Sequence, residues 1–91
     1  MQKHAKPPPD VEDVAPKGVE ITAYDQAHFV TYLRLLDAEA EGATWEDVAR
    51  IVLHRDPLTE PERARSCWEN HLARARWLSR NGYQHILAQS R

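Results

Sequence analysis

Apolar residues from Val19 onward recur at intervals of three and four positions, and this periodicity restricts most of the chain to helices. The segment over residues 19–22 has an extended character, but it is too short to form a sheet by itself. A chain of 91 residues is long enough for one domain. We therefore expect an all-α fold, a small helical bundle over residues 19–91.

Start and stop signals predict a first helix over residues 25–41. Asp25 is suited to the N-cap position, and Gly42 can take the left-handed conformation that ends many helices. The apolar stripe of this helix consists of Phe29, Tyr32, Leu33, Leu36 and Ala40. Such a stripe is typical of a helix that packs against a core.

A second, shorter helix is predicted to begin after Thr44 and to end near His54, before Asp56-Pro57. Thr44 and Asp47 have the spacing of a capping box, with Asp in place of Glu. The apolar residues of this helix lie on several of its sides, so we expect it to be wedged between its neighbours.

The third predicted helix, residues 59–80, has the clearest signals. Thr59 and Glu62 have the spacing of a capping box, and Pro61 stands in the first turn, where a missing N–H costs nothing. Asn81-Gly82 ends the helix. The predicted core of the domain is Phe29, Leu33, Leu36, Trp45, Val48, Val52, Trp68, Leu72 and Leu78.

The two ends of the chain carry weaker signals. Residues 1–18 are rich in proline and balanced in charge, and they lack a periodic apolar pattern, which predicts a flexible tail. A role as a polyproline ligand is the alternative for this segment. Residues 83–88 are expected to fold back as a terminal turn or helix.

Composition excludes several classes of function. The formal net charge of −2 gives no general attraction to DNA. Cys67 is the one cysteine, so neither an internal disulfide nor a cysteine-based zinc site is expected. Cys67 and His71 have the spacing for contact on one helix, but both lie on the apolar face. We expect a cytoplasmic non-enzyme without cofactor, metal, membrane segment or small-molecule ligand.

The second and third helices together have the layout of a helix-turn-helix, whose second helix enters the major groove of DNA. Residues 62–80 contain five arginines, and Arg63 and Arg65 stand near the start of the helix. Two features weaken a DNA-binding interpretation. The turn over residues 54–59 is longer than usual, and the arginines spread over two sides of the helix.

A protein partner is favoured by two other features. Acidic residues without a basic neighbour gather around the turn between the first two helices, and Trp77 is expected to face outward beside Arg74 and Asn70. A C-terminal segment that covers Trp77 is an equally good alternative. The candidate partner-binding residues are Trp77, Arg74, Asn70, Asp37, Glu41, Glu46 and Asp47.

Residues 24–87 resemble a family of domains of unknown function from regulators of rhizobial and other proteobacterial integrative and conjugative elements. The segments that carry the resemblance are HFVTYLRLLDAEAEGATWEDVARIVL, the acidic-proline turn and WENHLARARWLSRNGYQHIL. The resemblance implies a helix-turn-helix variant with an extended turn. Larger members of that family are transcriptional activators with an additional N-terminal domain, and short members include antiactivators.

The first hypothesis is therefore an antiactivator that binds the N-terminal domain of a transcriptional activator controlling excision and conjugative transfer. This hypothesis makes DNA an unlikely partner. The alternative is a DNA-binding helix-turn-helix regulator that reads its site with the third helix, using Arg63 and Arg65.

Overall fold

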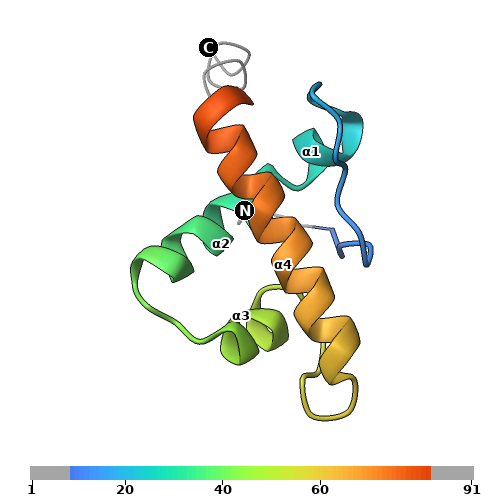
Figure 1. Cartoon of the computed structure of the whole chain (residues 1–91), viewed down its shortest axis with the longest axis vertical. Coiled ribbons are helices and arrows are strands. Elements are labelled where there is room, and N and C mark those ends of the chain that lie inside the picture. The colour runs from blue at the N-terminus through green and yellow to red at the C-terminus, as the bar shows by residue number, and fades with distance from the viewer. Residues whose placement is uncertain (1–8, 83–91) are drawn as a thin grey trace, which may run out of the picture.

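The computed structural model describes residues 9–82, which are helical without any strand (Figure 1). The elements in chain order are α1 (Ala23–Ala27), α2 (Phe29–Ala40), α3 (Trp45–Ile51), α4 (Pro61–Trp77) and a π-helical turn, η1 (Leu78–Gly82). The prediction of an all-α fold is confirmed. The predicted terminal segment over residues 83–88 lies outside the described residues.

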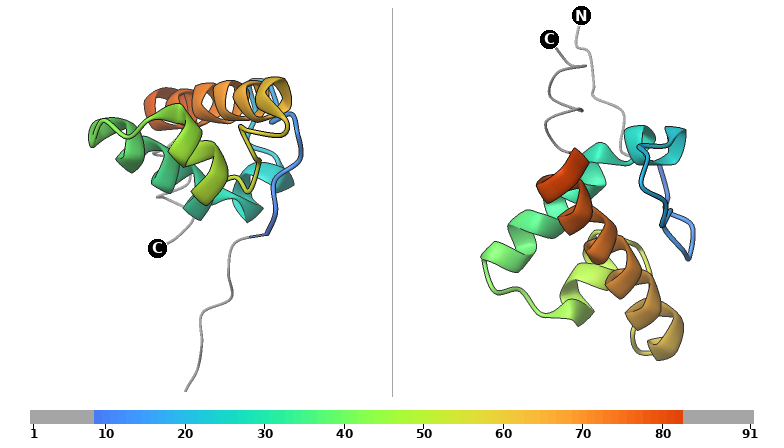
Figure 2. Two further views of the ribbon diagram at one scale, coloured as in Figure 1. Left: turned by 90° about the horizontal axis from the view of Figure 1, so that it is seen from below. Right: turned by 45° about the horizontal axis from the view of Figure 1, so that its top comes forward.

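The long helix α4 organises the domain. Helices α2 and α3 both pack against it, and α3, the turn over residues 52–60 and α4 form a helix-turn-helix arrangement with an extended turn. Figure 2 (left) shows α4 along one edge of the molecule, with α2 and α3 on one side of it. The chain before α1 runs beside α4 on its other flank (Figure 1).

The predicted first helix is divided into two. Thr22 is the N-cap of α1, and its hydroxyl accepts a hydrogen bond from the Asp25 amide while the Asp25 side chain bonds back to the Thr22 amide. Asp25 is therefore the N3 residue of α1 and closes a capping box with Thr22, so its expected role as an N-cap is wrong. The helix is interrupted at His28 before α2 begins.

Helix α3 begins as predicted. Thr44 is its N-cap and accepts from the Asp47 amide, and Gly42, with a φ of 78°, takes the left-handed conformation after α2. The Asp47 carboxylate bonds Arg50 instead of closing a capping box. After the helix, His54 has a φ of 58°, which turns the chain toward α4.

The start of α4 differs from the prediction. Its N-cap is Glu60, without a side-chain cap, and Pro61 occupies the first turn as expected. Thr59 cannot cap the helix because its hydroxyl bonds Asp56, whose carboxylate also accepts from the Leu58 amide. The predicted Thr59–Glu62 capping box is therefore absent.

The core lies between α2, α3 and α4. Val48, Leu72 and Leu78 are buried in it, but the most deeply buried side chains include Tyr32, Leu35 and Leu53. Other residues expected in the core are partly buried and pack against it: Phe29, Leu36, Val52 and Trp68. Leu33 and Trp45, also expected in the core, are half-buried and lie outside this cluster.

Residues 9–22, here called the N-terminal segment, lie against α4. Val11 and Ala15 are buried, at 7% and 3% exposure, and Val11 belongs to the core cluster. The expectation of a flexible tail over residues 1–18 therefore does not hold for residues 9–18. The segment is ordered because side chains of α4 form hydrogen bonds with its backbone. Composition does not reveal such contacts.

Candidate nucleic-acid interface

Exposed residues on the side of α4 and η1 opposite the core form one surface, here called the outer strip. Its members recur at three- and four-residue intervals, as the positions on one face of a helix do. They are Glu62, Arg65, Ser66, Glu69, Ala73, Arg76 and Arg80. Three arginines against two glutamates give this strip a formal charge of +1 in a chain whose total is −2.

Arg65 contacts two indole rings and one carboxylate. Its guanidinium carbon lies 5.0 Å from the ring centroid of Trp45 and 5.3 Å from that of Trp68. Its Nε donates to Glu69 at 3.0 Å, an i, i+4 ion pair. Two indoles from α3 and α4 and one carboxylate therefore restrict the position of this guanidinium.

Arg76 and Arg80 extend the positive charge toward the C-terminal end of α4. Arg76 pairs with Glu39 of α2, with its Nε 3.2 Å from Oε1, and remains about half exposed. Arg80 is exposed. The outer strip therefore has cations at both ends, separated by the small side chains of Ser66 and Ala73.

Arg63 lies on the flank of α4 and contacts the N-terminal segment. Its Nε lies 2.9 Å from Asp13 Oδ1, and its Nη1 donates to Glu60. Asp13 also accepts from Arg55 at 3.0 Å. Hydrogen bonding from Arg63 lowers the pKa of Asp13 against the opposing effect of desolvation, and Arg55 lowers it further. Arg63, predicted as a DNA contact, is therefore engaged within the domain.

Arg74 and Asn70, two predicted partner-binding residues, instead hold the N-terminal segment in place. Arg74 is buried, at 4% exposure, and donates to the carbonyls of Gly18 at 2.6 Å and Glu20 at 2.8 Å. Asn70 accepts from the Ala15 amide at 2.7 Å and donates to the Asp13 carbonyl at 2.9 Å. The expectation that Arg74 faces a partner is wrong, because its guanidinium is buried and donates to these carbonyls and to the Asp25 carboxylate.

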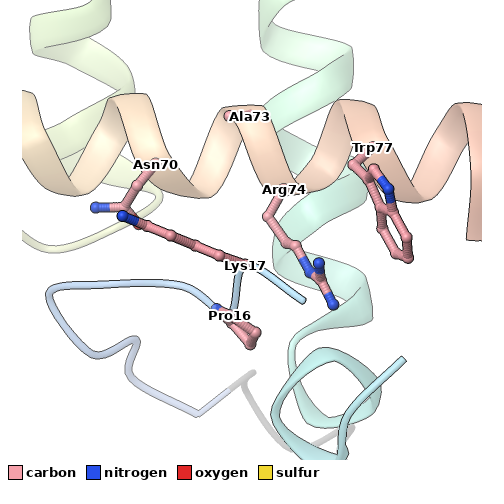
Figure 3. A pocket seen from close by; sticks show the side chains of 6 residues that line it. All are labelled: Pro16, Lys17, Asn70, Ala73, Arg74 and Trp77. Atoms are coloured by element: carbon pink, nitrogen blue, oxygen red, sulfur yellow. The ribbon is translucent and has the colours of Figure 1, made fainter. Parts of the chain in front are cut away.

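Trp77 lines a pocket of about 260 Å³ between α4 and the N-terminal segment. Figure 3 shows Asn70, Arg74 and Trp77 projecting from α4 toward the side on which Pro16 and Lys17 lie. Arg74 stacks on the Trp77 ring, 4.3 Å from its centroid. Trp77 is thus half-buried beside the interface between α4 and the N-terminal segment, and it does not stand alone on the surface.

The predicted acidic corner between α2 and α3 is exposed. Asp37, Glu41 and Glu46 carry no ion pair to any residue between 9 and 82, whereas Asp47 pairs with Arg50 at 2.8 Å. These four residues and Trp77 lie at different places on the domain, so the structure does not combine them into one surface.

A buried polar network that the sequence analysis missed joins α1, α4 and the N-terminal segment. The Tyr24 hydroxyl accepts from the Glu12 amide at 2.9 Å and lies 2.7 Å from His71 Nε2. His71 Nδ1 lies 2.9 Å from the Cys67 carbonyl and 3.6 Å from the thiol. Burial lowers the pKa of His71 and raises the pKa of Cys67.

Asp25 is also buried, and the sequence did not predict that it holds several elements together. Its burial would raise its pKa, but hydrogen bonds from Arg74, Thr22 and Tyr32 outweigh this effect and lower it. The spacing of Thr22 and Asp25, which is that of a capping box, is the sequence signal that could have located it.

Between residues 9 and 82, no group of three or more His, Cys, Asp or Glu side chains is placed to hold a metal ion. No helix in the same range has the length and apolar character that crossing a membrane requires.

The helix-turn-helix arrangement makes this chain a small all-helical domain. The chain belongs to the RovC DNA-binding domain family, described as "T6SS, Transcription factor, DNA binding domain", whose model matches residues 4–88. No curated protein matches the chain. The match supports a DNA-binding regulator family, which is the broader part of what the sequence resemblance implied.

Proposed function

We propose that this chain is a DNA-binding domain of a transcriptional regulator and that it places the outer strip of α4 in the major groove. The observation that carries the proposal is the position of this strip on the second helix of a helix-turn-helix, where residues 9–82 leave it uncovered. The major groove, about 12 Å wide, admits one helix. Membership of a family described as a transcription-factor DNA-binding domain supports the same function.

The chemistry of the outer strip fits this role. Ser66 and Ala73 are small, so they allow the helix to approach the floor of the groove, and Arg76 and Arg80 can reach phosphates beside it. The formal charge of −2 on the whole chain gives no long-range attraction. Affinity would therefore depend on local contacts, and non-specific binding would be weak.

The proposal is tested by fluorescence anisotropy with the full chain and duplexes enriched from a random-sequence library. We expect binding at about 50 mM salt that weakens as salt rises, with a log–log slope of about −2 because Arg76 and Arg80 each neutralise one phosphate. Replacing Arg76 and Arg80 together by alanine should reduce this slope by nearly 2. Arg34→Ala, on the exposed surface of α2, is the matched control.

Failure to enrich or bind any duplex at about 50 mM salt would refute the proposal. Binding that is equally weakened by Arg34→Ala would show that α4 is not the contact surface. Circular dichroism of each variant tests whether the fold is retained. We expect that it is, because Arg34, Arg76 and Arg80 are all exposed.

A second candidate function is that of a protein-binding antiactivator, as the resemblance to the antiactivator QseM implies. The observation that favours it is the exposed acidic corner, with Asp37, Glu41 and Glu46, on a chain of net charge −2. This surface would repel DNA and suits a basic surface on the N-terminal domain of an activator. The context would be quorum-sensing-linked repression of the horizontal transfer of an integrative and conjugative element.

This second function is tested by calorimetric titration of the chain with a purified activator of conjugative transfer. Charge reversal at Glu41 and Glu46 should abolish binding, because both residues belong to the exposed acidic corner. Glu20→Lys, an exposed acidic position in the N-terminal segment, is the control. Absence of a complex with the activator would refute this candidate and leave the DNA-binding function intact.

Neither function assigns catalysis to this chain. Cys67 and His71 are both fully buried, and the raised pKa of the thiol disfavours the thiolate that nucleophilic attack requires. These side chains support a structural role in the core.

The proposed site of action is the cytoplasm, where bacterial DNA is accessible.

A further inference from the structure

The guanidinium of Arg65 has one occupied edge and one open edge. Its Nε donates to Glu69, and its central carbon lies 5.0 Å and 5.3 Å from the ring centroids of Trp45 and Trp68. Within residues 9–82, its terminal nitrogens Nη1 and Nη2 have no hydrogen-bond partner, and the side chain is 49% exposed. A planar pair of donors is thus held in position and available to an external acceptor.

The other arginines of α4 with defined partners use their terminal nitrogens inside the domain. Arg63 donates through Nη1 to Glu60, Arg74 through both terminal nitrogens to the N-terminal segment and Asp25, and Arg76 through Nη2 to Glu39. Arg65 differs because only its Nε contacts a carboxylate, whereas Arg63, Arg74 and Arg76 each use Nε together with a terminal nitrogen. Its end-on fork is left open.

We propose that Arg65 reads a guanine in the major groove, donating from Nη1 and Nη2 to the O6 and N7 atoms of the base. This inference rests on the proposed DNA-binding function. Arg65 lies in the second turn of α4, and the N-terminal part of a recognition helix contacts base edges. An end-on bidentate contact from arginine to guanine is the commonest specific contact in protein–DNA complexes.

The surroundings of Arg65 favour a base over a phosphate. The Glu69 carboxylate lies 3.0 Å from its Nε, and Glu62 stands on the same outer strip. Negative charges here would repel a phosphate, whereas a carboxylate beside the guanine contact can accept from the N4 amino group of a cytosine.

Trp45 and Trp68 act as positioning residues in this arrangement. Their rings, 6.2 Å apart and tilted by 42°, come from the two helices of the helix-turn-helix and restrict the guanidinium from one side. The orientation of Arg65 therefore depends on the packing of α3 against α4. A lysine at this position would keep the charge but lose the planar fork.

The test compares duplexes selected from a random-sequence library by the wild-type chain, Arg65→Ala and Arg65→Lys. The wild type should select one invariant guanine, and both variants should lose the preference at that position. Replacing this guanine by 7-deazaguanine removes N7 and should weaken wild-type binding about 5-fold or more, as expected for loss of part of a bidentate contact. The same replacement should leave Arg65→Ala unaffected.

Different outcomes refute different statements. Arg65→Ala that selects the same guanine, or that binds all sequences uniformly more weakly, refutes the guanine contact and leaves the DNA-binding function intact. A wild-type chain that binds no duplex refutes both. Arg34→Ala, which should select the wild-type sequence, is the control for loss of an exposed arginine elsewhere.

Discussion

Arg74 of α4 and Asp25 of α1 form a buried two-point ion pair, with Nε 3.0 Å from Oδ1 and Nη2 2.6 Å from Oδ2. Both side chains are almost inaccessible to solvent, at 3% and 0% exposure. The Tyr32 hydroxyl donates to the same carboxylate at 2.8 Å. This one carboxylate therefore joins α1, α2 and α4, and Arg74 joins them to the N-terminal segment.

Removing one member of this pair should strongly destabilise the domain. Arg74→Met keeps much of the side-chain volume but leaves the Asp25 carboxylate buried without its counter-charge, which typically costs about 3–5 kcal/mol. Urea denaturation measures the loss, and Arg80→Met, at an exposed position, should change stability by less than about 0.5 kcal/mol. A loss below about 1 kcal/mol for Arg74→Met would contradict the structural role of the pair.

Stability should rise with pH through the titration of His71. Burial lowers the pKa of this imidazole in the folded state below the ordinary 6.5, so the unfolded chain binds a proton more readily. Its contribution is complete above about pH 6.5 and is lost as pH falls toward the folded pKa, with a slope of at most about 1.4 kcal/mol per pH unit. Urea denaturation across this range should show a smaller slope for His71→Gln than for the wild type.

The exposed His54 provides the control for this pH series. His54 is exposed and its Nδ1 lies 3.3 Å from Asp10 Oδ1, so comparing His54→Gln with the wild type separates any effect of this surface contact from the effect of His71. Equal slopes for wild type and His71→Gln would show that another group controls the pH dependence.

Asn70→Ala should release the N-terminal segment locally. The substitution removes the side-chain partner of the exposed Asp13 carbonyl and of the amide of the buried Ala15, and an unsatisfied buried group costs about 1–3 kcal/mol. Hydrogen exchange should accelerate at Ala15, whereas amides in the middle of α4 should keep their protection. Asn81→Ala, at an exposed position, serves as the comparison. Unchanged exchange at Ala15 would mean that Asn70 does not hold the segment.

Two glycines offer a matched pair of alanine substitutions. Gly42 has a φ of 78°, and neither glycine has a heavy atom within 4 Å of an added Cβ. Gly42→Ala should therefore lower stability by about 1–2 kcal/mol through backbone strain without a clash. Gly18→Ala, which is free of that φ constraint, should be neutral or slightly stabilising. Thermal unfolding distinguishes the two, and equal melting temperatures would contradict the strain at Gly42.

The sequence by itself determined the local structure wherever the signal was short-range. The Thr44 cap, the left-handed Gly42 and Pro61 in the first turn of α4 follow from bonds and dihedral angles within a few residues. The apolar period likewise located α2, α3 and α4. Once α4 is located, helix geometry fixes which positions share a face, so the sequence also places Arg65, Arg76 and Glu69 on one side of this helix.

Tertiary structure decided which polar residues are buried and what they bind. Arg74 and Asn70 look like surface residues on a helical wheel, yet the N-terminal segment covers them, and that segment has no periodic pattern of its own. Contacts between residues more than 50 positions apart create this arrangement. Tertiary structure also sets the position of the Arg65 guanidinium, because this group contacts the Trp45 indole of α3. Long-range packing, which no local propensity encodes, sets the environment of these groups.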